Sequence, residues 1–171
     1  MKNFLHWGPI LGLSMINFVI ATTMFFLFQW QYPLHNLYSF LNYFFYICLA
    51  ILIFYHYFSA IIIGPGLIPF KWKPKKKNDE QFLQYCHKCE GFKAPRSHHC
   101  SKCNRCVMKM DHHCPWINNC VGHANHHHFI YFLLFGVIGS FQTFFILGMT
   151  LYRAIFDIPV SKISLIVYFV N

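Results

Sequence analysis

One short stretch of the chain holds most of its chemically reactive side chains. Residues 86–120 read CHKCEGFKAPRSHHCSKCNRCVMKMDHHCPWINNC and contain seven of the eight cysteines and five of the twelve histidines. Zinc prefers cysteine and histidine ligands. Within the stretch, Asp111-His112-His113-Cys114 combines a thiol, an imidazole that can act as its base and a carboxylate that can orient the base. The sequence therefore predicts a zinc module in which one cysteine is kept for chemistry.

The cysteine spacing fits two zinc sites with four ligands each. Cys86 and Cys89 form one C-x2-C pair, and Cys100 and Cys103 form another. In this spacing one tight turn presents two thiolates to the same ion. If Cys114 is the nucleophile, six cysteines remain, and two histidines complete the two sites.

In two places, adjacent residues of the stretch are expected to have different roles. Neighbouring side chains in an extended chain point to opposite faces, so we expect His99 and Cys100 to bind different ions. The same reasoning separates His113 from Cys114, so that one of them can hold metal while the other faces a substrate. The alternative role for Cys114 is a seventh zinc ligand, but the ligand count closes without it.

Apolar segments on both sides place this module at a membrane. Hydrophobic residues make up 56% of the chain and charged residues 11%, which is too apolar for an ordinary soluble domain. A spanning helix needs roughly 20 mostly apolar residues, and Trp7–Trp30, Phe40–Ile63 and Phe129–Tyr152 are each long enough. The first is interpreted as a retained helix, because it is too long for a signal peptide. Ile163–Val170 is interpreted as a fourth span cut short.

The expected fold is an α-helical multi-pass membrane protein with a small zinc module, irregular or built from short β-strands, between spans two and three. The predicted parts are a transmembrane hairpin over 1–66 with spans at about 8–29 and 40–63, a basic connector over 67–85, a cysteine-rich module over 86–125, and a third span with a truncated fourth span over 126–171.

Basic residues predict the orientation. Eleven of the fourteen Lys and Arg residues lie between Lys71 and Lys109, whereas the loop Gln31–Leu37 has none. By the positive-inside rule the zinc module and the N-terminus face the cytosol. The cytosol is reducing, so the cysteines are expected to be metal ligands or reactive thiols and not disulfides.

The five lysines of Lys71–Lys77 have two compatible interpretations. They are a solvated run of charge that fixes topology, or they contact anionic lipid headgroups, where each charge contributes ~1 kcal/mol. Nucleic acid is not an expected partner, because a cluster so close to membrane spans meets lipid first.

These residues resemble a known family, the DHHC-type protein S-acyltransferases, also called palmitoyltransferases. The resemblance runs from Tyr85 to Phe129 and rests on the Cys and His spacing together with Pro95-Arg96-Ser97-His98-His99-Cys100, Asp111 to Trp116, Asn118-Asn119-Cys120 and Gly122 with Asn125. The plan of four spans with a cytosolic loop is also similar to this family.

The resemblance implies a role for each reactive residue. It assigns one zinc ion to Cys86, Cys89, His99 and Cys106, and the other to Cys100, Cys103, His113 and Cys120. It makes Cys114 the acylated nucleophile, His112 its base and Asp111 the partner that orients His112. The implied donor is a fatty acyl-CoA such as palmitoyl-CoA, with Lys93, Arg96 and His98 at the phosphates of coenzyme A.

The expected function is therefore transfer of a long-chain acyl group from acyl-CoA to cysteines of proteins at the cytosolic membrane face, through an acyl-enzyme on Cys114. A membrane-anchored zinc adaptor without catalysis is the alternative. The opening His6-Trp7-Gly8-Pro9 and the breaker Gly64-Pro65-Gly66 are similar to an endoplasmic-reticulum branch of the family, with the Golgi as the alternative location.

Two departures from the family pattern concern the ends of spans. Gly64 stands where the family usually has aspartate, and the chain stops before a Thr-Thr-x-Glu motif would follow the fourth span. We therefore expect a fragment or a shortened form.

His126-His127-His128 could suggest a third metal site. We expect it instead to form the first turn of the third span, with Asn125 capping the helix.

The charge pattern predicts the outcome of proteolysis in sealed microsomes with their cytosolic side outward. A protease that cleaves after lysine is expected to cut at Lys75 to Lys77 without detergent, because the lysine-rich connector is assigned to the cytosol. Cleavage is read from fragment size on a gel. Protection until detergent is added would reverse the orientation.

Overall fold

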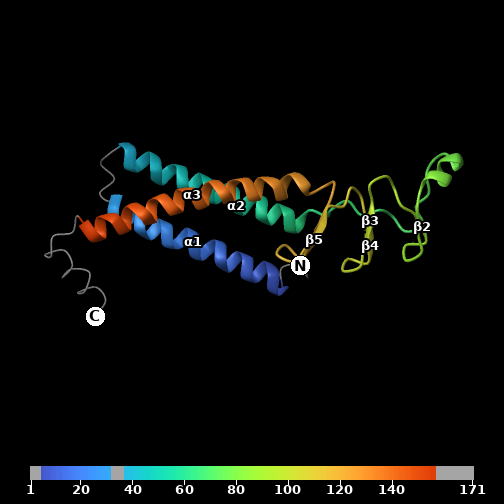
Figure 1. Cartoon of the computed structure of the whole chain (residues 1–171), viewed down its shortest axis with the longest axis horizontal. Helices are drawn as coiled ribbons and strands as arrows, with labels where there is room; N and C mark the ends of the chain where they lie inside the picture. The colour runs from blue at the N-terminus through green and yellow to red at the C-terminus, as the bar shows by residue number, and fades with distance from the viewer. Residues whose placement is uncertain (1–4, 32–36, 157–171) are drawn as a thin grey trace. The chain divides into compact units, whose positions relative to one another are not determined.

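The three long apolar runs form three helices. The computed structural model describes residues 5–31 and 37–156, and its helices are α1 (Trp7–Gln31), α2 (Leu37–Ile62) and α3 (His126–Phe156) (Figure 1). Each is long and apolar enough to cross a membrane, where a helix satisfies all of its own backbone hydrogen bonds. The three predicted spans are confirmed, and the predicted fourth span lies outside the described residues.

Between α2 and α3 the chain forms three short antiparallel hairpins. β1 (Tyr85–Cys86) pairs with β2 (Gly91–Phe92), β3 (His98–Cys100) with β4 (Arg105–Val107), and β5 (His112–Cys114) with β6 (Asn119–Val121). A short 3-10 helix, η1 (Lys77–Phe82), precedes them. The predicted short-strand module between helices two and three is thereby confirmed. Because a lone two-stranded hairpin is marginally stable in water, these hairpins need further links to hold their shape.

The chain forms two compact units. One comprises Met1–Ile16 and Ile51–Phe135, and the other comprises Asn17–Ala50 and Gly136–Asn171. The first unit contains the whole cysteine-rich module together with the adjoining ends of α1, α2 and α3. The helix ends next to the cysteine-rich module therefore belong to the same unit as the module.

The second unit holds its helical segments together with both apolar and polar contacts. Leu27, Tyr46 and Ile146 form a buried cluster. Thr143 Oγ1 lies 3.1 Å from both Thr23 Oγ1 and the Tyr46 hydroxyl. Polar side chains in a membrane segment are costly without partners, and this triad satisfies its hydroxyls internally.

In the first unit, two asparagines tie the third hairpin to the end of α2. Asn119 Nδ2 lies 3.4, 3.3 and 3.1 Å from the carbonyl oxygens of Ala60, Ile61 and Ile63. Asn125 Nδ2 donates to the carbonyls of Ala60 and Ile63 at 3.2 and 3.3 Å. The last carbonyls of a helix have no partner within the helix. The amides of the module therefore complete the hydrogen bonding of the membrane helix.

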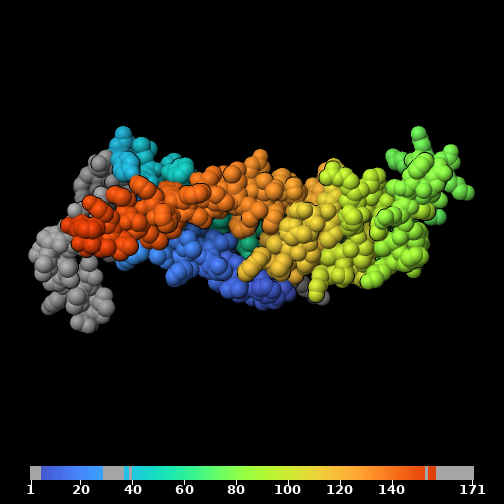
Figure 2. All heavy atoms as spheres, in the orientation of Figure 1, coloured from blue at the N-terminus to red at the C-terminus, as the bar shows by residue number. Residues whose placement is uncertain are grey.

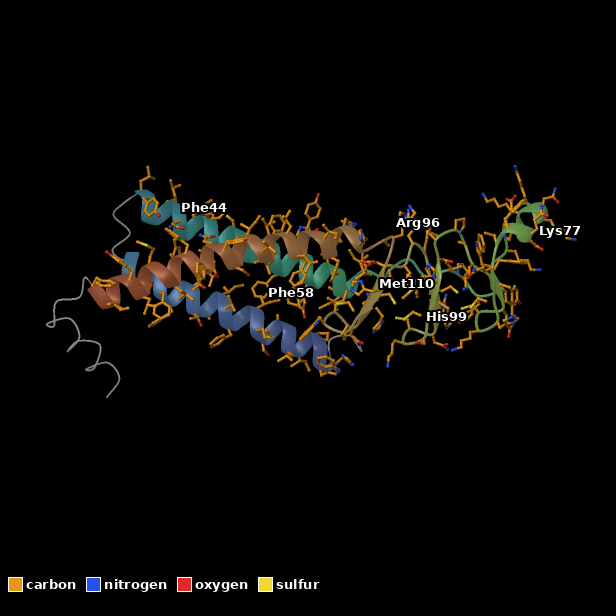
Figure 3. All side chains as sticks on the ribbon, in the orientation of Figure 1. Phe44, Phe58, Lys77, Arg96, His99 and Met110 are labelled. Atoms are coloured by element: carbon orange, nitrogen blue, oxygen red, sulfur yellow. The ribbon has the colours of Figure 1, made fainter. Side chains whose placement is uncertain are left out.

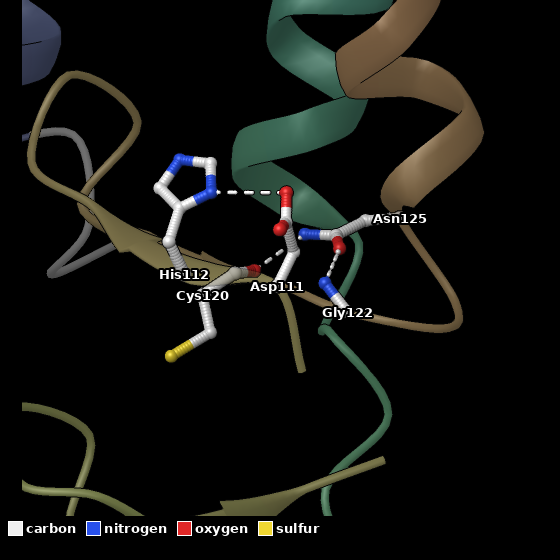
Figure 4. A network of polar contacts seen from close by, with 5 residues as sticks. All are labelled: Asp111, His112, Cys120, Gly122 and Asn125. Carbon is white, nitrogen blue, oxygen red and sulfur yellow. Dashed lines mark hydrogen bonds and ion pairs between the residues drawn. The ribbon is translucent and has the colours of Figure 1, made fainter. Parts of the chain in front are cut away.

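The start of α3 departs in one detail from the sequence-based prediction. The three histidines do form its first turn, and the Asn125 carbonyl accepts the Phe129 N–H at 3.1 Å. Asn125 thus occupies the capping position that we predicted. Its side-chain oxygen, however, accepts a hydrogen bond from Gly122 N–H at 2.9 Å (Figure 4), so the side chain serves the module rather than the helix amides.

After α2 the chain runs beside β4. Met108 N–H donates to the Gly66 carbonyl at 2.8 Å, and Ile68 N–H donates to the Cys106 carbonyl at 2.8 Å. Gly66 has a φ of 87°, a left-handed conformation that glycine adopts without strain. A Cβ on Gly122 would lie 2.5 Å from the Pro65 carbonyl oxygen, so the close approach requires glycine there. The Gly-Pro-Gly breaker therefore ends the helix as predicted and lays the connector against the module.

The lysine-rich part of the connector lies at the end of this unit that is remote from the start of α3. Lys77 marks it in Figure 3, and the bright green segment protrudes there in Figure 2. Lys71 Nζ lies 3.4 Å from Glu90 Oε2, with both side chains exposed. These charges are solvated in the structure, which leaves contact with lipid headgroups a prediction.

Replacing Asn125 by alanine is expected to loosen the module from α2. Asn125 is fully buried, and its loss removes the acceptor of the Gly122 N–H, at about 1–3 kcal/mol for a buried group left unpaired, and leaves the carbonyls of Ala60 and Ile63 with Asn119 as their remaining side-chain donor. The midpoint of thermal unfolding in detergent should fall clearly, whereas Ser101→Ala, at an exposed position, should leave it almost unchanged. Equal midpoints for the two variants would contradict the tether.

Candidate functional site

The first cluster of metal-binding side chains joins the first two hairpins. Cys86, Cys89, His99 and Cys106 place one ligand atom each within 4.8 Å of one another. His99 Nδ1 lies 3.5, 3.4 and 3.9 Å from the sulfurs of Cys86, Cys89 and Cys106. With Zn–S near 2.3 Å and Zn–N near 2.0 Å, tetrahedral ligand atoms stand roughly 3.5–3.8 Å apart. The cluster therefore fits one zinc ion.

The second cluster repeats this arrangement between the second and third hairpins. Its members are Cys100, Cys103, His113 and Cys120. His113 Nδ1 lies 3.6, 3.4 and 3.6 Å from the three sulfurs in that order, and the sulfurs of Cys103 and Cys120 are 3.3 Å apart. The structure thus brings the eight residues together in the two sets of four that the family resemblance implied.

Strand register explains how each hairpin supplies its ligands. His99 stands directly opposite Cys106, and His113 stands directly opposite Cys120. Facing side chains in an antiparallel pair have Cβ atoms about 5 Å apart, so an imidazole and a thiol can reach one ion together. Because Cys100 follows His99 in the strand, it points to the other face and serves the second cluster.

Burial in the two clusters shifts the pKa of several of their side chains. Burial, helped by hydrogen bonds with Cys86 and Cys89, raises the pKa of Cys106 to about 12. Burial likewise raises the pKa of Cys120. Burial and the nearby Lys102 lower the pKa of His113, which keeps its imidazole neutral and able to donate a lone pair. Zinc would displace the thiol protons, so its binding weakens as the pH falls.

The DHHC tetrapeptide uses the two faces of β5 for different purposes. His113 points to the zinc cluster, whereas His112 and Cys114, two residues apart in the strand, share the opposite face. His112 Nδ1 lies 3.2 Å from Asp111 Oδ2 (Figure 4). A carboxylate at Nδ1 fixes the imidazole tautomer and leaves Nε2 for the reacting group. The structure therefore pairs Asp111 with His112, and strand alternation sets His112 and Cys114 on one face of β5.

Cys114 lies outside both zinc clusters and faces the membrane helices. Its side chain is 4% exposed. It belongs to a buried apolar cluster with Tyr57, Ala60, Ile61, Ile117 and Val121, against which residues of α1 and α3 also pack. The one cysteine of the module without a zinc partner is therefore the one that borders an apolar space.

Tyr57 contributes to the site in a way that the sequence did not predict. Its hydroxyl lies 3.1 Å from the carbonyls of both Pro9 and Trp116, so it bridges α1 to the turn that follows Cys114. A Cβ on Gly8 would overlap the Pro115 carbonyl oxygen, which shows how closely α1 approaches that turn. A tyrosine inside an apolar run carries no spacing signal that would have identified this role.

A polar depression lies beside Asp111. It encloses about 540 Å³ and is lined by Arg96, His98, Lys109, Met110, Asp111, His123, His126 and His127. Two of the three residues expected at coenzyme A phosphates, Arg96 and His98, lie here. The third, Lys93, is not part of this lining, and its Nζ donates to Gln84 Oε1 at 3.1 Å. Lys109 and the later histidines also line this depression, which no sequence pattern predicted.

Comparisons with known proteins agree with this arrangement. Residues 79–170 match the model of the DHHC palmitoyltransferase family. The chain is 48% identical over 157 residues to palmitoyltransferase ZDHHC6 of Danio rerio, covering 92% of this chain and 38% of that protein. It is 47% identical over 156 residues to palmitoyltransferase ZDHHC6 of Homo sapiens, covering 91% and 38%. The chain thus spans 38% of the length of these relatives.

The two clusters predict two zinc ions per chain in the purified protein. Cys103→Ser removes a ligand and should lower the zinc content by about one ion or more, because metal-binding free energy also folds the module. Cys114→Ser, the matched control, removes a thiol that neither cluster uses and should keep both ions. Metal analysis by mass spectrometry measures the ratio. One ion per unmodified chain, with the other thiols freely alkylated, would contradict the second site.

Proposed function

The chain belongs to the DHHC palmitoyltransferase family, and from this premise we propose that it transfers a long-chain acyl group, palmitoyl, from acyl-CoA to cysteine thiols of target proteins. The observation that carries the proposal is the position of Cys114, which shares a strand face with His112 while its neighbour His113 turns to zinc. The alternative of an adaptor without catalysis does not account for this separation.

In the first step, His112 takes the proton of Cys114 and the thiolate attacks the thioester carbonyl of the donor. The carbon–sulfur bond to coenzyme A breaks, and the departing thiolate receives the proton held by His112. Asp111 orients His112 and stabilises its charged form from 3.2 Å. A free thiol with pKa near 8.5 is only a few per cent ionised at neutral pH, which is why an adjacent base matters.

In the second step, the acyl group passes from Cys114 to a target protein. The target thiol loses its proton to His112 and attacks the acyl thioester, and Cys114 leaves as a thiolate that recovers the proton. In each of the two steps, His112 thus acts first as the base and then as the acid. The products are an acylated target cysteine and the free enzyme thiol.

The surroundings of Cys114 suit an acyl chain and a nucleotide on different sides. The apolar cluster around Cys114 includes Tyr57 and Ile61 of α2, with Phe129 and Phe132 of α3 packed against it. These side chains offer the fatty chain a path among the helices. The depression beside Asp111 carries Arg96 and His98 and suits the phosphates of coenzyme A. Lys93 is retained as a phosphate partner on resemblance alone.

Zinc has a structural part in this proposal. The two sets of ligands would hold one ion each, and the ions would fix the hairpins so that β5 presents Cys114 to the helices. The reactive face of β5 is the one opposite the metal-binding His113. The ions would therefore shape the site without contacting the bond that breaks.

The proposed location is the endoplasmic-reticulum membrane, with the Golgi as the alternative, and with the module and the N-terminus in the cytosol. The lysine excess around the module supports the orientation. Proposed partners are membrane lipids at the lysines and cysteine-containing proteins at the cytosolic face.

Incubation with palmitoyl-CoA is expected to produce a thioester adduct that hydroxylamine removes. Cys114→Ser should abolish it. His112→Ala should slow its formation by the ~100- to 10,000-fold typical of a lost general base while both zinc ions stay bound, and His113→Ala should lose zinc and adduct together. Loss of zinc in His112→Ala with zinc retained in His113→Ala would refute the division of roles between these neighbours.

A further inference from the structure

The three hairpins of the module are structural repeats. Each first strand ends in a cysteine, namely Cys86, Cys100 and Cys114, and these cysteines follow one another at intervals of fourteen residues. Each one pairs with the residue five positions later: Cys86 with Gly91, Cys100 with Arg105 and Cys114 with Asn119. The third hairpin therefore has the register of the first two.

The turns of the three hairpins also share a backbone feature. The residue four positions after each of these cysteines has a left-handed conformation, with φ of 51° at Glu90, 50° at Asn104 and 45° at Asn118. Such values are uncommon outside glycine, so their recurrence at one place indicates the same turn. In the first two hairpins this turn is a zinc knuckle, meaning a turn whose first and fourth residues are the two thiol ligands of one ion.

The third turn differs from a zinc knuckle at one side chain. Its first residue is Cys114, but its fourth residue is Ile117, at the place that Cys89 and Cys103 occupy in the other two turns. Ile117 is fully buried and packs in the same cluster as Cys114, Tyr57 and Ala60. A hydrocarbon side chain therefore stands where the repeat would supply a second thiol.

The side chains around the third turn also differ from those that complete the first two knuckles. The first knuckle is completed by His99 and Cys106 of the next hairpin, and the second by His113 and Cys120 of the next. After the third hairpin comes α3, so no further histidine and cysteine pair faces the third turn within residues 122–156. Apolar residues of α2 and α3 cover it instead. The third turn thus lacks the second thiol and also the ligands from a following hairpin.

We propose that Ile117 is a positioning residue that keeps Cys114 available for acyl transfer, because it replaces the second thiol of a latent metal-binding knuckle. The hairpin holds Cys114 where a metal ligand would be, and Ile117 anchors the turn in the apolar cluster without offering a partner thiol. The inference rests on the role proposed above for Cys114. Its chemical content is that Ile117→Cys restores the two thiols of the knuckle, which bind a thiophilic divalent cation at two of its coordination positions and release one proton each as the ion binds.

The test compares Ile117→Cys with Ile117→Ala, a control that shortens the side chain without adding a ligand. The probe is Cd²⁺, added to purified protein whose two zinc sites are filled. Ile117→Cys should bind one additional cadmium ion and lose its acyl adduct at a cadmium concentration about tenfold or more below that needed for Ile117→Ala, because the second thiol acts intramolecularly. A chelator should restore the adduct, and the double variant Cys114→Ser with Ile117→Cys should lose the additional ion.

Each remaining outcome decides the inference. Equal cadmium binding and equal inhibition in the two single variants would overturn it. Loss of the two zinc ions in Ile117→Cys alone would also overturn it, since the repeat requires that the turn accommodate a thiol there. If the unmodified protein formed no acyl adduct, the proposed function would fail, while cadmium stoichiometry would still decide whether the third turn is a latent knuckle.

Discussion

The sharing of metal ligands between successive hairpins is the constraint on which the rest of the structure depends. Strands of two or three residues make a hairpin that is only marginally stable in water. The first hairpin supplies only a C-x2-C pair and the third supplies only a facing histidine and cysteine, whereas the second supplies both, one pair to each cluster. Two ions would therefore connect three hairpins in series. The shape of the last hairpin, which carries Cys114, depends on ligands that lie up to 28 residues earlier in the chain.

The module is joined to the membrane helices by hydrogen bonds to the carbonyls at the end of α2, which have no partner within the helix. Asn119 and Asn125 donate to the terminal carbonyls of α2, and Tyr57 donates back to the turn after Cys114. This reciprocal bonding fixes Cys114 against apolar side chains, while the side chains of Asp111 and His112 remain partly exposed. The two environments suit the two halves of the acyl-CoA donor that we propose, a hydrocarbon chain and a charged nucleotide.

Residue types and spacing were sufficient to predict the cysteine pairs that recur along the chain and the residues that alternate between the two faces of a strand. The C-x2-C pairs and strand alternation separated His99 from Cys100 and His113 from Cys114, and apolar runs of sufficient length predicted the three helices. The direction of the Asn125 side chain, the bridge made by Tyr57 and the wall formed by Lys109 with His123 depend on which distant segments meet, which no local pattern encodes. The fourteen-residue repeat was visible in the sequence but carries meaning only once the shared turn conformation is known.

The central claim is that the zinc-bound module presents one thiol for acylation. The most direct measurement is to expose the unmodified, zinc-loaded protein to palmitoyl-CoA and to map the acyl group by mass spectrometry of its peptides while zinc content is followed. The account predicts a single acylated position, Cys114, with both zinc ions retained. Acylation spread over the cysteines of the two clusters, or acylation that appears only as zinc is lost, would contradict it.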